Sequence, residues 1–382
     1  MTPARAYLRG LLIVAIASGA ACTAVPEQVV LGIALTESNH DAVQLAAAHI
    51  NDDGGISGVP LRLAGLDWRF SAEASSEEIL EWADRFASNA ELLALIGHSD
   101  SGSTLAGAAV YNQRRLPQIV TIATNPAITN IGAWTYRICL SDAYQGPALA
   151  DYAVREWGKR RIAVFYVNDD YGRGLAQQFE RRAAELGAEM VASMFHRNVL
   201  GAEDEQLVRS VLQRLRDTVP PPDLFVLFQR LAAGAWTAKA IRDAGYATDI
   251  LAGDNLGTPA FAAQGDFVEG VRASRFFMPA ADDELAERFV REYTRVVGRE
   301  PNYGDAFAYD AVYLFRDAVA GGGFSRDGVK RYLDELIASG SEIEGVAGSY
   351  VLGSDHDARR SLFIAEVRSG RYELVREISL RR

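Results

Sequence analysis

The sequence of residues 29–66 is VVLGIALTESNHDAVQLAAAHINDDGGISGVPLRLAGL. It starts with an apolar run at Val29–Leu35, continues with an amphipathic segment from Asp41 to Asn51, and returns to an apolar run at Leu61–Leu66. Two acidic residues and two glycines follow the amphipathic segment, and glycine supplies the positive φ at which helices end. The pattern predicts strand, helix and strand, which is the repeating unit of a parallel sheet.

The same alternation continues along the chain. The segment Ser76–Ala87 is the next predicted helix, with Ile79, Leu80, Ala83, Phe86 and Ala87 spaced to face a sheet. A strand at 92–96 follows it. A second set begins after Asp142, with helices predicted at 143–156, 174–186, 205–216 and 232–244 and strands at 162–167, 189–195, 224–228 and 250–252.

The last third of the chain starts no third set. Helices predicted near 283–297, 305–320 and 326–339 lack strong strands between them, so we expect them to return and cover the first lobe. The segments 361–368 and 372–378 flank Ser369-Gly370-Arg371 and predict a hairpin. The expected fold class is therefore α/β, with two doubly wound parallel-sheet lobes.

Length, composition and charge limit the possible functions. The chain has 382 residues, of which 49% are hydrophobic, and this favours two folded domains over one. Its formal net charge of -11 argues against nucleic acid as a partner, because most of the surface would repel phosphate.

The first residues resemble an export signal. Arg5 and Arg9 precede the apolar run Leu11–Ala17, and the small residues 18–21 lead into Cys22. The apolar run is too short to span a bilayer. Small residues before a cysteine resemble a bacterial lipobox, which would make Cys22 the lipid anchor. Because Gly19 stands where a lipobox usually has an aliphatic residue, cleavage by an ordinary signal peptidase is the alternative.

We therefore expect the mature chain in the periplasm or on the outer face of the cell membrane, held there only through a lipid. Once Cys22 is lipidated or removed, Cys139 remains alone, so no intramolecular disulfide is expected. Cys139 lies in an apolar, strand-like run and is expected to be a buried, inert thiol.

Enzyme signatures are incomplete in this sequence. The string Gly97-His98-Ser99-Asp100-Ser101 lacks the last glycine of a G-x-S-x-G elbow. In the segment 172–177, Gln177 replaces the third glycine of a dinucleotide fingerprint. The five histidines are dispersed without metal-ligand spacing, and no Walker A string occurs. We expect no catalysis, no cofactor and no metal.

Several short strings together resemble the periplasmic binding proteins for leucine, isoleucine and valine, which serve ABC importers of branched-chain amino acids. The resemblance spans Val29 to about Leu352. The strings are Ile50-Asn51-Asp52-Asp53-Gly54-Gly55-Ile56-Ser57-Gly58, Leu95-Ile96-Gly97-His98 leading to Ser101, Ala123-Thr124-Asn125-Pro126, Asp142-Ala143-Tyr144-Gln145-Gly146, Asp170-Tyr171-Gly172-Arg173-Gly174 and Ala252-Gly253-Asp254-Asn255.

The resemblance implies the type I periplasmic binding fold, in which three crossovers join two lobes that close on a ligand. The crossovers would lie near 137–142, 270–276 and 345–352. Residues 1–27 would be the signal segment and linker, 28–139 plus 272–344 the first lobe, and 140–271 plus 345–382 the second. The implied function is capture of a small amino-acid-like ligand, leucine in the best-known members, and its delivery to the membrane permease of an ABC importer.

An α-amino acid needs hydrogen-bond donors for its carboxylate and an acceptor for its ammonium group. Ser101 and Gly102 leave a predicted strand and open a helix, whose N-terminus favours an anion. Gly102 also permits close approach of the ligand to the backbone. Thr124 follows the next strand and would stand beside Ser101 at the carboxyl ends of the strands.

By resemblance, Ser101 and Thr124 bind the carboxylate, with a main-chain contact near Ile122 or Ala123. The alternatives are that Ser101 or Ser103 is only a helix N-cap and that Asn125-Pro126 is a plain turn.

The candidate for the ammonium is Asp254, which follows the predicted strand at 250–252 and aligns with an acidic position of the family. A buried ammonium needs such a counter-charge. Tyr171 matches an aromatic residue that packs over the ligand. The alternatives are an N-cap for Asp254 and an ordinary core position for Tyr171.

Two departures from the family bear on specificity. Only Thr36–His40 connects the first strand and helix, where the family has a longer, glycine-containing loop that lines the pocket. At Phe228-Gln229-Arg230-Leu231 the family tends to have glycines and an aromatic residue, and Arg230 would meet an acidic ligand group or face solvent.

Two other functions use the same fold. A sensor module would report its ligand to a receptor or regulator, and the absence of a fused kinase or DNA-binding segment in the given sequence favours an importer component instead. A scaffold for protein partners would show no stabilisation by a small ligand.

Overall fold

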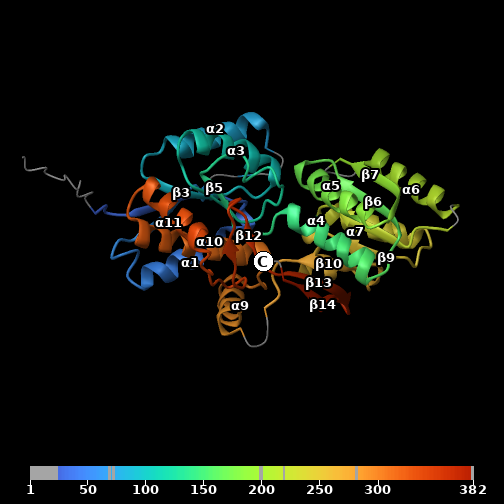
Figure 1. Ribbon diagram of the computed structural model, residues 1–382. Coiled ribbons are helices and arrows are strands. Elements are labelled where there is room, and N and C mark those ends of the chain that lie inside the picture. Colours follow the sequence, from blue (N-terminus) through green and yellow to red (C-terminus); the bar gives the residue numbers. More distant parts are fainter. Residues whose placement is uncertain are drawn as a thin grey trace, which may run out of the picture.

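The computed structural model describes residues 25–67, 70, 74–197, 201–217, 220–279 and 283–379. It contains two α/β lobes that lie side by side, with the C-terminal end of the chain near their junction (Figure 1). The predicted export segment and Cys22 lie outside the described residues. Among the described residues, none of the helices has the length and apolar character needed to cross a membrane.

The first lobe is built on a parallel sheet of five strands in the order β2-β1-β3-β4-β5. The chain passes from β1 to β2 on one side and then to β3 on the other side of β1, so the strand order reverses at β1. Ligands of such sheets bind at the carboxyl ends of the strands beside this reversal. The elements are β1 (Val29–Ala34), α1 (His40–Asp52), β2 (Leu61–Ala64), α2 (Ser76–Ser88), β3 (Leu92–Gly97), α3 (Ser101–Gln113), β4 (Gln118–Val120) and β5 (Thr135–Arg137).

The second lobe has a seven-stranded sheet in the order β14-β13-β10-β9-β8-β6-β7. The predicted C-terminal hairpin forms its antiparallel edge. The elements are α4 (Asp142–Asp151) with a π-helical extension (Tyr152–Glu156), β6 (Arg161–Val167), α5 (Asp170–Glu185), β7 (Glu189–His196), α6 (Ala202–Arg216), β8 (Leu224–Phe228), α7 (Leu231–Asp243), β9 (Asp249–Ala252), α8 (Pro259–Ala262), β10 (Arg272–Arg275), β13 (Leu362–Arg368) and β14 (Arg371–Ile378).

Three helices return to the first lobe, as predicted: α9 (Glu284–Val297), α10 (Tyr303–Gly322) and α11 (Arg326–Ser339). Helix α10 is buried along most of its length, and it lies against α1 and α11 (Figure 1). A two-stranded ribbon of β11 (Val351–Leu352) and β12 (Ala358–Arg359) follows.

Two predicted lobe boundaries differ from this arrangement. Strand β10 pairs with β9 and β13, so residues 272–275 belong to the second sheet and not to the first lobe. Tyr350, Leu352 and Ala358 pack in the first-lobe core, and the backbone of Arg137 forms a bridge with Asp357. The third crossover therefore follows β12, beyond the predicted segment 345–352. Strand pairing determines both boundaries, and the hydrophobicity of a segment does not show which strand it pairs with.

Two local predictions can be compared directly. Leu80 on α2 is 46% exposed, so it does not belong to the buried stripe formed by Ile79, Ala83, Phe86 and Ala87. Cys139 is fully buried, as predicted, and burial raises the pKa of its thiol to about 12. A thiol that is protonated at neutral pH and closed to solvent is a poor nucleophile.

Candidate ligand-binding site

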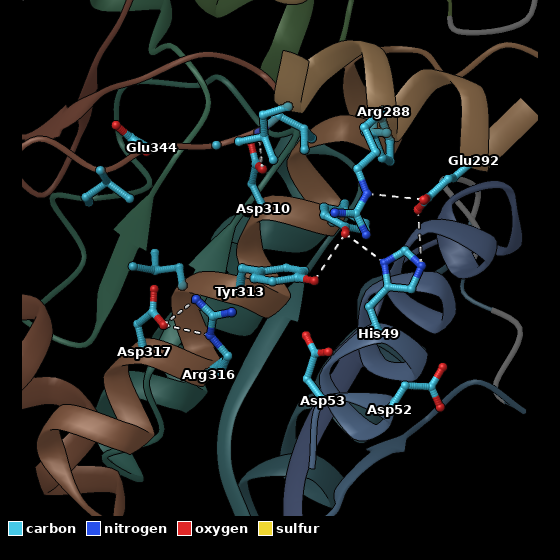
Figure 2. Close-up of a pocket in the computed structure, with 17 residues that line it drawn as sticks. His49, Asp52, Asp53, Arg288, Glu292, Asp310, Tyr313, Arg316, Asp317 and Glu344 are labelled. Carbon is cyan, nitrogen blue, oxygen red and sulfur yellow. Dashed lines mark hydrogen bonds and ion pairs between the residues drawn. The ribbon is translucent and has the colours of Figure 1, made fainter. Parts of the chain in front are cut away.

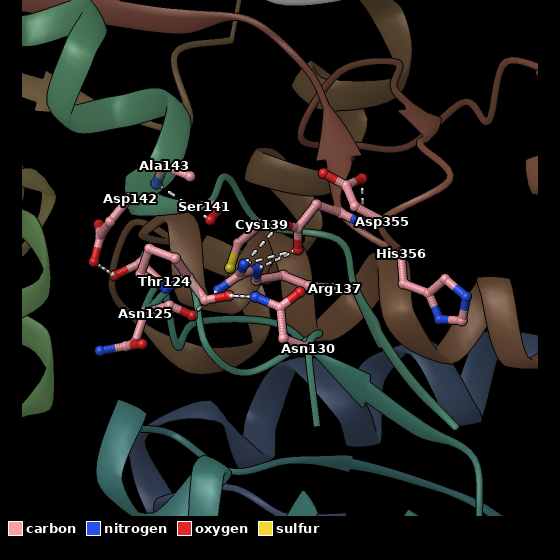
Figure 3. Close-up of polar contacts among 12 residues, drawn as sticks. Thr124, Asn125, Asn130, Arg137, Cys139, Ser141, Asp142, Ala143, Asp355 and His356 are labelled. Atoms are coloured by element: carbon pink, nitrogen blue, oxygen red, sulfur yellow. Dashed lines mark hydrogen bonds and ion pairs between the residues drawn. The ribbon is translucent and has the colours of Figure 1, made fainter. Parts of the chain in front are cut away.

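The loop that carries Thr124 is held by a buried arginine. The Arg137 guanidinium donates to the Ala123 carbonyl oxygen at 3.2 Å and to the Asn125 carbonyl oxygen at 2.7 Å. Its other nitrogens donate to the two carboxylate oxygens of Asp357 at 2.8 and 2.9 Å. Arg137 is fully buried, so this bidentate pair and the two carbonyl contacts fix the loop in place (Figure 3).

Ser101 lies at the start of α3 and is buried. The capping alternative for Ser101 and Ser103 is wrong, because the N-cap is Asp100, whose Oδ1 accepts from the Ser103 amide at 2.9 Å. Ser101 Oγ accepts a hydrogen bond from the Asn125 amide at 3.4 Å, which leaves its own proton available. A Cβ on Gly102 would lie 3.2 Å from Asp170 Oδ2 of the second lobe, so glycine permits close approach here.

The Thr124 hydroxyl is already engaged as a donor. It donates to Asp142 Oδ2 at 3.0 Å (Figure 3), and its remaining capacity is that of an acceptor. Asp142 is fully buried, and its Oδ1 has no hydrogen-bond partner among the described residues. Burial, followed by the nearby charge of Asp254, raises the pKa of Asp142 well above its usual range.

Asp254 lies two residues after the end of β9, and its carboxylate accepts hydrogen bonds from both lobes. Its Oδ1 accepts from Gln145 Nε2 at 2.8 Å and from the Tyr171 hydroxyl at 3.1 Å, and its Oδ2 accepts from the Tyr303 hydroxyl at 3.3 Å. Asp254 is 1% exposed, and burial raises the pKa of its carboxyl group. The residue before its short 3-10 helix is Gly253, so Asp254 is not the N-cap.

A tight turn places Tyr171 beside Asp254. Asp169 caps α5 by accepting from the Gly172 amide at 2.8 Å. A Cβ on Gly172 would lie only 2.1 Å from the Val167 carbonyl oxygen, so the turn between β6 and α5 requires glycine. Helix α5 starts at Asp170, four residues before the predicted start, and Tyr171 is therefore a buried residue of its first turn.

The two lobes touch at this site. The Asn125 side chain of the first lobe donates to the Asp170 carbonyl oxygen of the second lobe at 2.6 Å, and α3 contacts α5. Tyr303 comes from α10 of the first lobe and reaches Asp254 of the second. Side chains of both lobes thus meet in a largely buried interlobe cluster. It consists of Ser101, Thr124, Asn125 and Tyr303 of the first lobe and Asp142, Gln145, Tyr171 and Asp254 of the second.

Two cavities flank the cluster. Ser101, Gly102 and Tyr171 line a cavity of about 370 Å³, together with Arg173 and Arg230. Ile122 and Tyr303 line another of about 200 Å³. Neither cavity is lined by Ala123, Thr124 or Asp254, and all three residues are buried.

Arg230 is half-buried and pairs with Asp169 at 2.7 Å. Its Nε atom is buried without a hydrogen-bond partner among the described residues. Because Arg230 also lines the 370 Å³ cavity, it brings positive charge to the side of the site where Ser101 lies.

A cavity of about 450 Å³ lies elsewhere, on the first lobe between α1, α9 and α10 (Figure 2). None of the predicted site residues lines it. Many of its charged groups pair with one another: Glu292 lies 3.4 Å from His49 and 3.2 Å from Arg288, and Arg316 lies 2.7 Å from Asp317. At the interlobe cluster, by contrast, Asp142 Oδ1 and the neighbouring Arg230 Nε are buried without a hydrogen-bond partner among the described residues. The interlobe cluster is therefore the stronger candidate for a ligand site.

Asp310, at the edge of this outer cavity, predicts a pH effect on stability. Its carboxylate accepts from the Val346 and Ala347 amides, and burial raises its pKa to about 6. Arg360 lowers this pKa and Asp283 raises it, both by smaller amounts. The pKa in the folded state exceeds the unfolded value of about 3.9, so stability from this group is complete below pH ~4 and falls as pH rises to about 6.

We expect Asp310→Asn to remove a decline of up to about 3 kcal/mol in unfolding free energy across this pH range. Urea unfolding of both proteins between pH 4 and 7 measures the difference. Parallel stability curves for the two proteins would contradict the assignment. Because Asp142 and Asp254 remain in both proteins, their own pH dependence cancels in the comparison.

Three residues of the cluster were not assigned a role from the sequence. Asp142 and Gln145 lie in a string that carries the family resemblance, and this was the available signal for them. Tyr303 lies at the start of α10, and no local pattern distinguished it from an ordinary core tyrosine.

Comparison with known proteins identifies the family of this chain. A family model described as periplasmic binding protein matches residues 32–371, which is most of the chain. The chain belongs to the periplasmic binding protein family. The predicted resemblance to the leucine, isoleucine and valine type and the predicted fold class are thereby confirmed.

The relatives of this periplasmic binding protein include a Leu/Ile/Val-binding protein homologue of Brucella abortus, 26% identical over 73% of this chain and 72% of that one. An amino acid binding protein of Pseudomonas aeruginosa is 27% identical with the same coverage. The crystal structure of a leucine-binding protein of Thermotoga maritima has a TM-score of 0.80 at 25% identity, covering 92% of this chain and 99% of that one.

A substrate-binding protein of Desulfitobacterium hafniense in complex with leucine has a TM-score of 0.76 at 26% identity, covering 91% of this chain and all of that one. A solute-binding protein of Rhodopseudomonas palustris in complex with 3,4-dihydroxybenzoic acid has a TM-score of 0.78, covering 94% of this chain and 99% of that one. At 17% identity, this last likeness shows the fold alone.

Proposed function

We propose that this periplasmic binding protein captures a small amino-acid-like ligand between its lobes and delivers it, chemically unchanged, to an ABC importer. The observation that carries the proposal is the buried carboxylate of Asp254 at the contact between the lobes, whose charge acts on the buried Asp142. Asp142 Oδ1 has no hydrogen-bond partner among the described residues. Two buried carboxylates beside each other are unfavourable unless a cation or a proton joins them. A ligand ammonium group supplies that cation.

Thr124 belongs on the ammonium side of this site. Its hydroxyl proton is donated to Asp142, so its lone pairs accept from a ligand and do not bind a carboxylate through that proton. The geometry therefore favours a different role from the carboxylate contact implied by the family resemblance. Tyr171 donates to Asp254 and closes the site from the second lobe.

The ligand carboxylate is assigned to the side of Ser101 and Gly102. There the Ser101 hydroxyl proton, the first amides of α3 and the charge of Arg230 offer donors to an anion. The main chain at Ile122 and Ala123 lies between the two ends of the ligand. This division supports an α-amino acid, whose ammonium and carboxylate groups are attached to the same carbon atom.

Binding without catalysis, export and lipid anchoring through Cys22 belong to the same proposal. The alternative of a sensor module uses the same cleft. Uptake of the ligand by a strain that lacks the chain separates the two: an importer component is needed for uptake, whereas a sensor is not.

A thermal-shift screen of a chain that begins at residue 23 tests the binding proposal. The compounds are amino acids, amides, short-chain acids and polyamines. A ligand at a hundred times its dissociation constant should stabilise the folded chain by about 2.7 kcal/mol. We expect stabilisation by amino acids. A response to short-chain acids or polyamines without any response to amino acids would contradict the proposal.

A further inference from the structure

The cavity on the far side of the proposed ammonium site is polar and uncharged. Its volume is about 200 Å³. Ile122 is the one aliphatic side chain among its described lining residues, and none of them carries a charge. Hydroxyl and amide groups make up most of the lining and come from Ser38, Ser99, Thr258, Asn39, Asn255 and Asn302.

The short connection after β1 shapes this cavity. A single 3-10 turn at Glu37–Asn39 leads directly into α1. The Thr36 amide donates to Ser99 Oγ at 2.8 Å, and the Asn39 side chain donates to Asp305 at 3.3 Å. These bonds hold the connection against the wall of the site, so that it contributes hydroxyl and amide groups and no apolar side chain to the lining.

The cavity begins next to the proposed ammonium site. The Tyr303 hydroxyl lies 3.3 Å from Asp254 Oδ2 and 3.3 Å from Asn255 Oδ1. Ile122 also lines the cavity and precedes the Ala123–Thr124 segment. With its ammonium group on Asp254 and its carboxylate toward Ser101, an α-amino acid has this cavity open to its side chain.

An apolar ligand side chain gains little binding free energy in this polar cavity. It would bury its surface against hydroxyl and amide groups and exclude water from them without replacing the hydrogen bonds that water would make. The Asn255 side-chain oxygen accepts from Tyr303, while its side-chain nitrogen Nδ2 has no hydrogen-bond partner among the described residues, so a ligand oxygen can accept from Nδ2. A hydroxyl or amide on the ligand replaces the displaced water, whereas an isobutyl group does not.

We propose that the ligand is an α-amino acid with an uncharged polar side chain, bearing a hydroxyl or an amide, and not a branched aliphatic one. This inference rests on the proposed function, because it takes the positions of the ammonium and carboxylate groups from it. One additional hydrogen bond in the cavity corresponds to about tenfold in affinity.

Isothermal titration calorimetry of the chain beginning at residue 23 tests the inference with two sets of ligands. Asparagine, glutamine, serine and threonine form the polar set, and leucine, isoleucine and valine the aliphatic set. We expect the best polar ligand to bind about tenfold or more tightly than the best aliphatic one. Equal or tighter binding of an aliphatic ligand overturns the inference but leaves the proposed function intact. Binding of neither set overturns the inference, and the proposed function fails with it if charged and aromatic amino acids and amides do not bind either.

Asn255→Leu supplies the matched variant. It replaces a polar lining group by an apolar one of similar size, so the preference for polar ligands should shrink by about tenfold. Gln213→Leu makes the same type of change at an exposed position of α6 and should leave the preference unchanged. An unchanged preference in Asn255→Leu would contradict contact between the ligand and this cavity.

Discussion

Replacing Asp254 by asparagine is expected to weaken binding of the amino-acid ligand by about a hundredfold, because a ligand ammonium group would lose its buried counter-charge. Asparagine keeps the shape of the side chain and one oxygen that can accept from Tyr171 or Gln145. The variant therefore removes charge with little change in packing. Calorimetric titration of parent and variant with the best ligand measures the loss.

The matched control for this change is Asp266→Asn, an exposed residue of the same lobe. It should bind the ligand as the parent does. Thermal melting of both variants without ligand checks that they are folded. If Asp254→Asn is folded and binds within about twofold of the parent, the ammonium group does not lie on Asp254, since a buried charge contact of this type corresponds to a much larger change.

Replacing Arg137 by methionine is expected to lower the free energy of unfolding by about 3–5 kcal/mol. The change leaves Asp357 as a buried carboxylate without its bidentate partner. It also removes the donor for the Ala123 and Asn125 carbonyl oxygens, which hold the loop of Thr124. Urea unfolding followed by circular dichroism measures the effect.

Two comparisons make this prediction specific. Arg62→Met removes an exposed pair with Glu91 and should cost less than about 1 kcal/mol. The double change Arg137→Met with Asp357→Leu removes both buried charges and should recover part of the lost stability. A single Arg137→Met variant as stable as Arg62→Met would show that the buried pair does not stabilise the folded chain.

The alternation of apolar and amphipathic segments was sufficient to predict most strands and helices. Runs such as Ile162–Val167 and Leu224–Phe228 are buried on both faces of a parallel sheet, so they are continuously apolar and easily recognised. Lobe membership was harder to predict. Strand β10 has the same local character in either lobe, and its pairing with β13, about ninety residues away, determines its position.

Part of the site also followed from the sequence. Ser101 and Thr124 each follow a strand of the first-lobe sheet, and Asp254 follows a strand of the second-lobe sheet. A doubly wound sheet gathers the carboxyl ends of its strands at one edge. The carboxylate that accepts the hydrogen bond from Thr124 was not predictable in this way. The role of Thr124 depends on Asp142, and the environment of Asp254 depends on Tyr303, so both require the three-dimensional approach of the lobes.

A crystal structure of the chain with its tightest-binding amino acid would show directly where the ligand binds. We expect the ligand between the lobes, with its ammonium nitrogen within hydrogen-bonding distance of Asp254 and Thr124 Oγ1 and its carboxylate at Ser101 and the start of α3. A ligand bound in the outer cavity between α1, α9 and α10, or between the lobes without contact to Asp254, would contradict it.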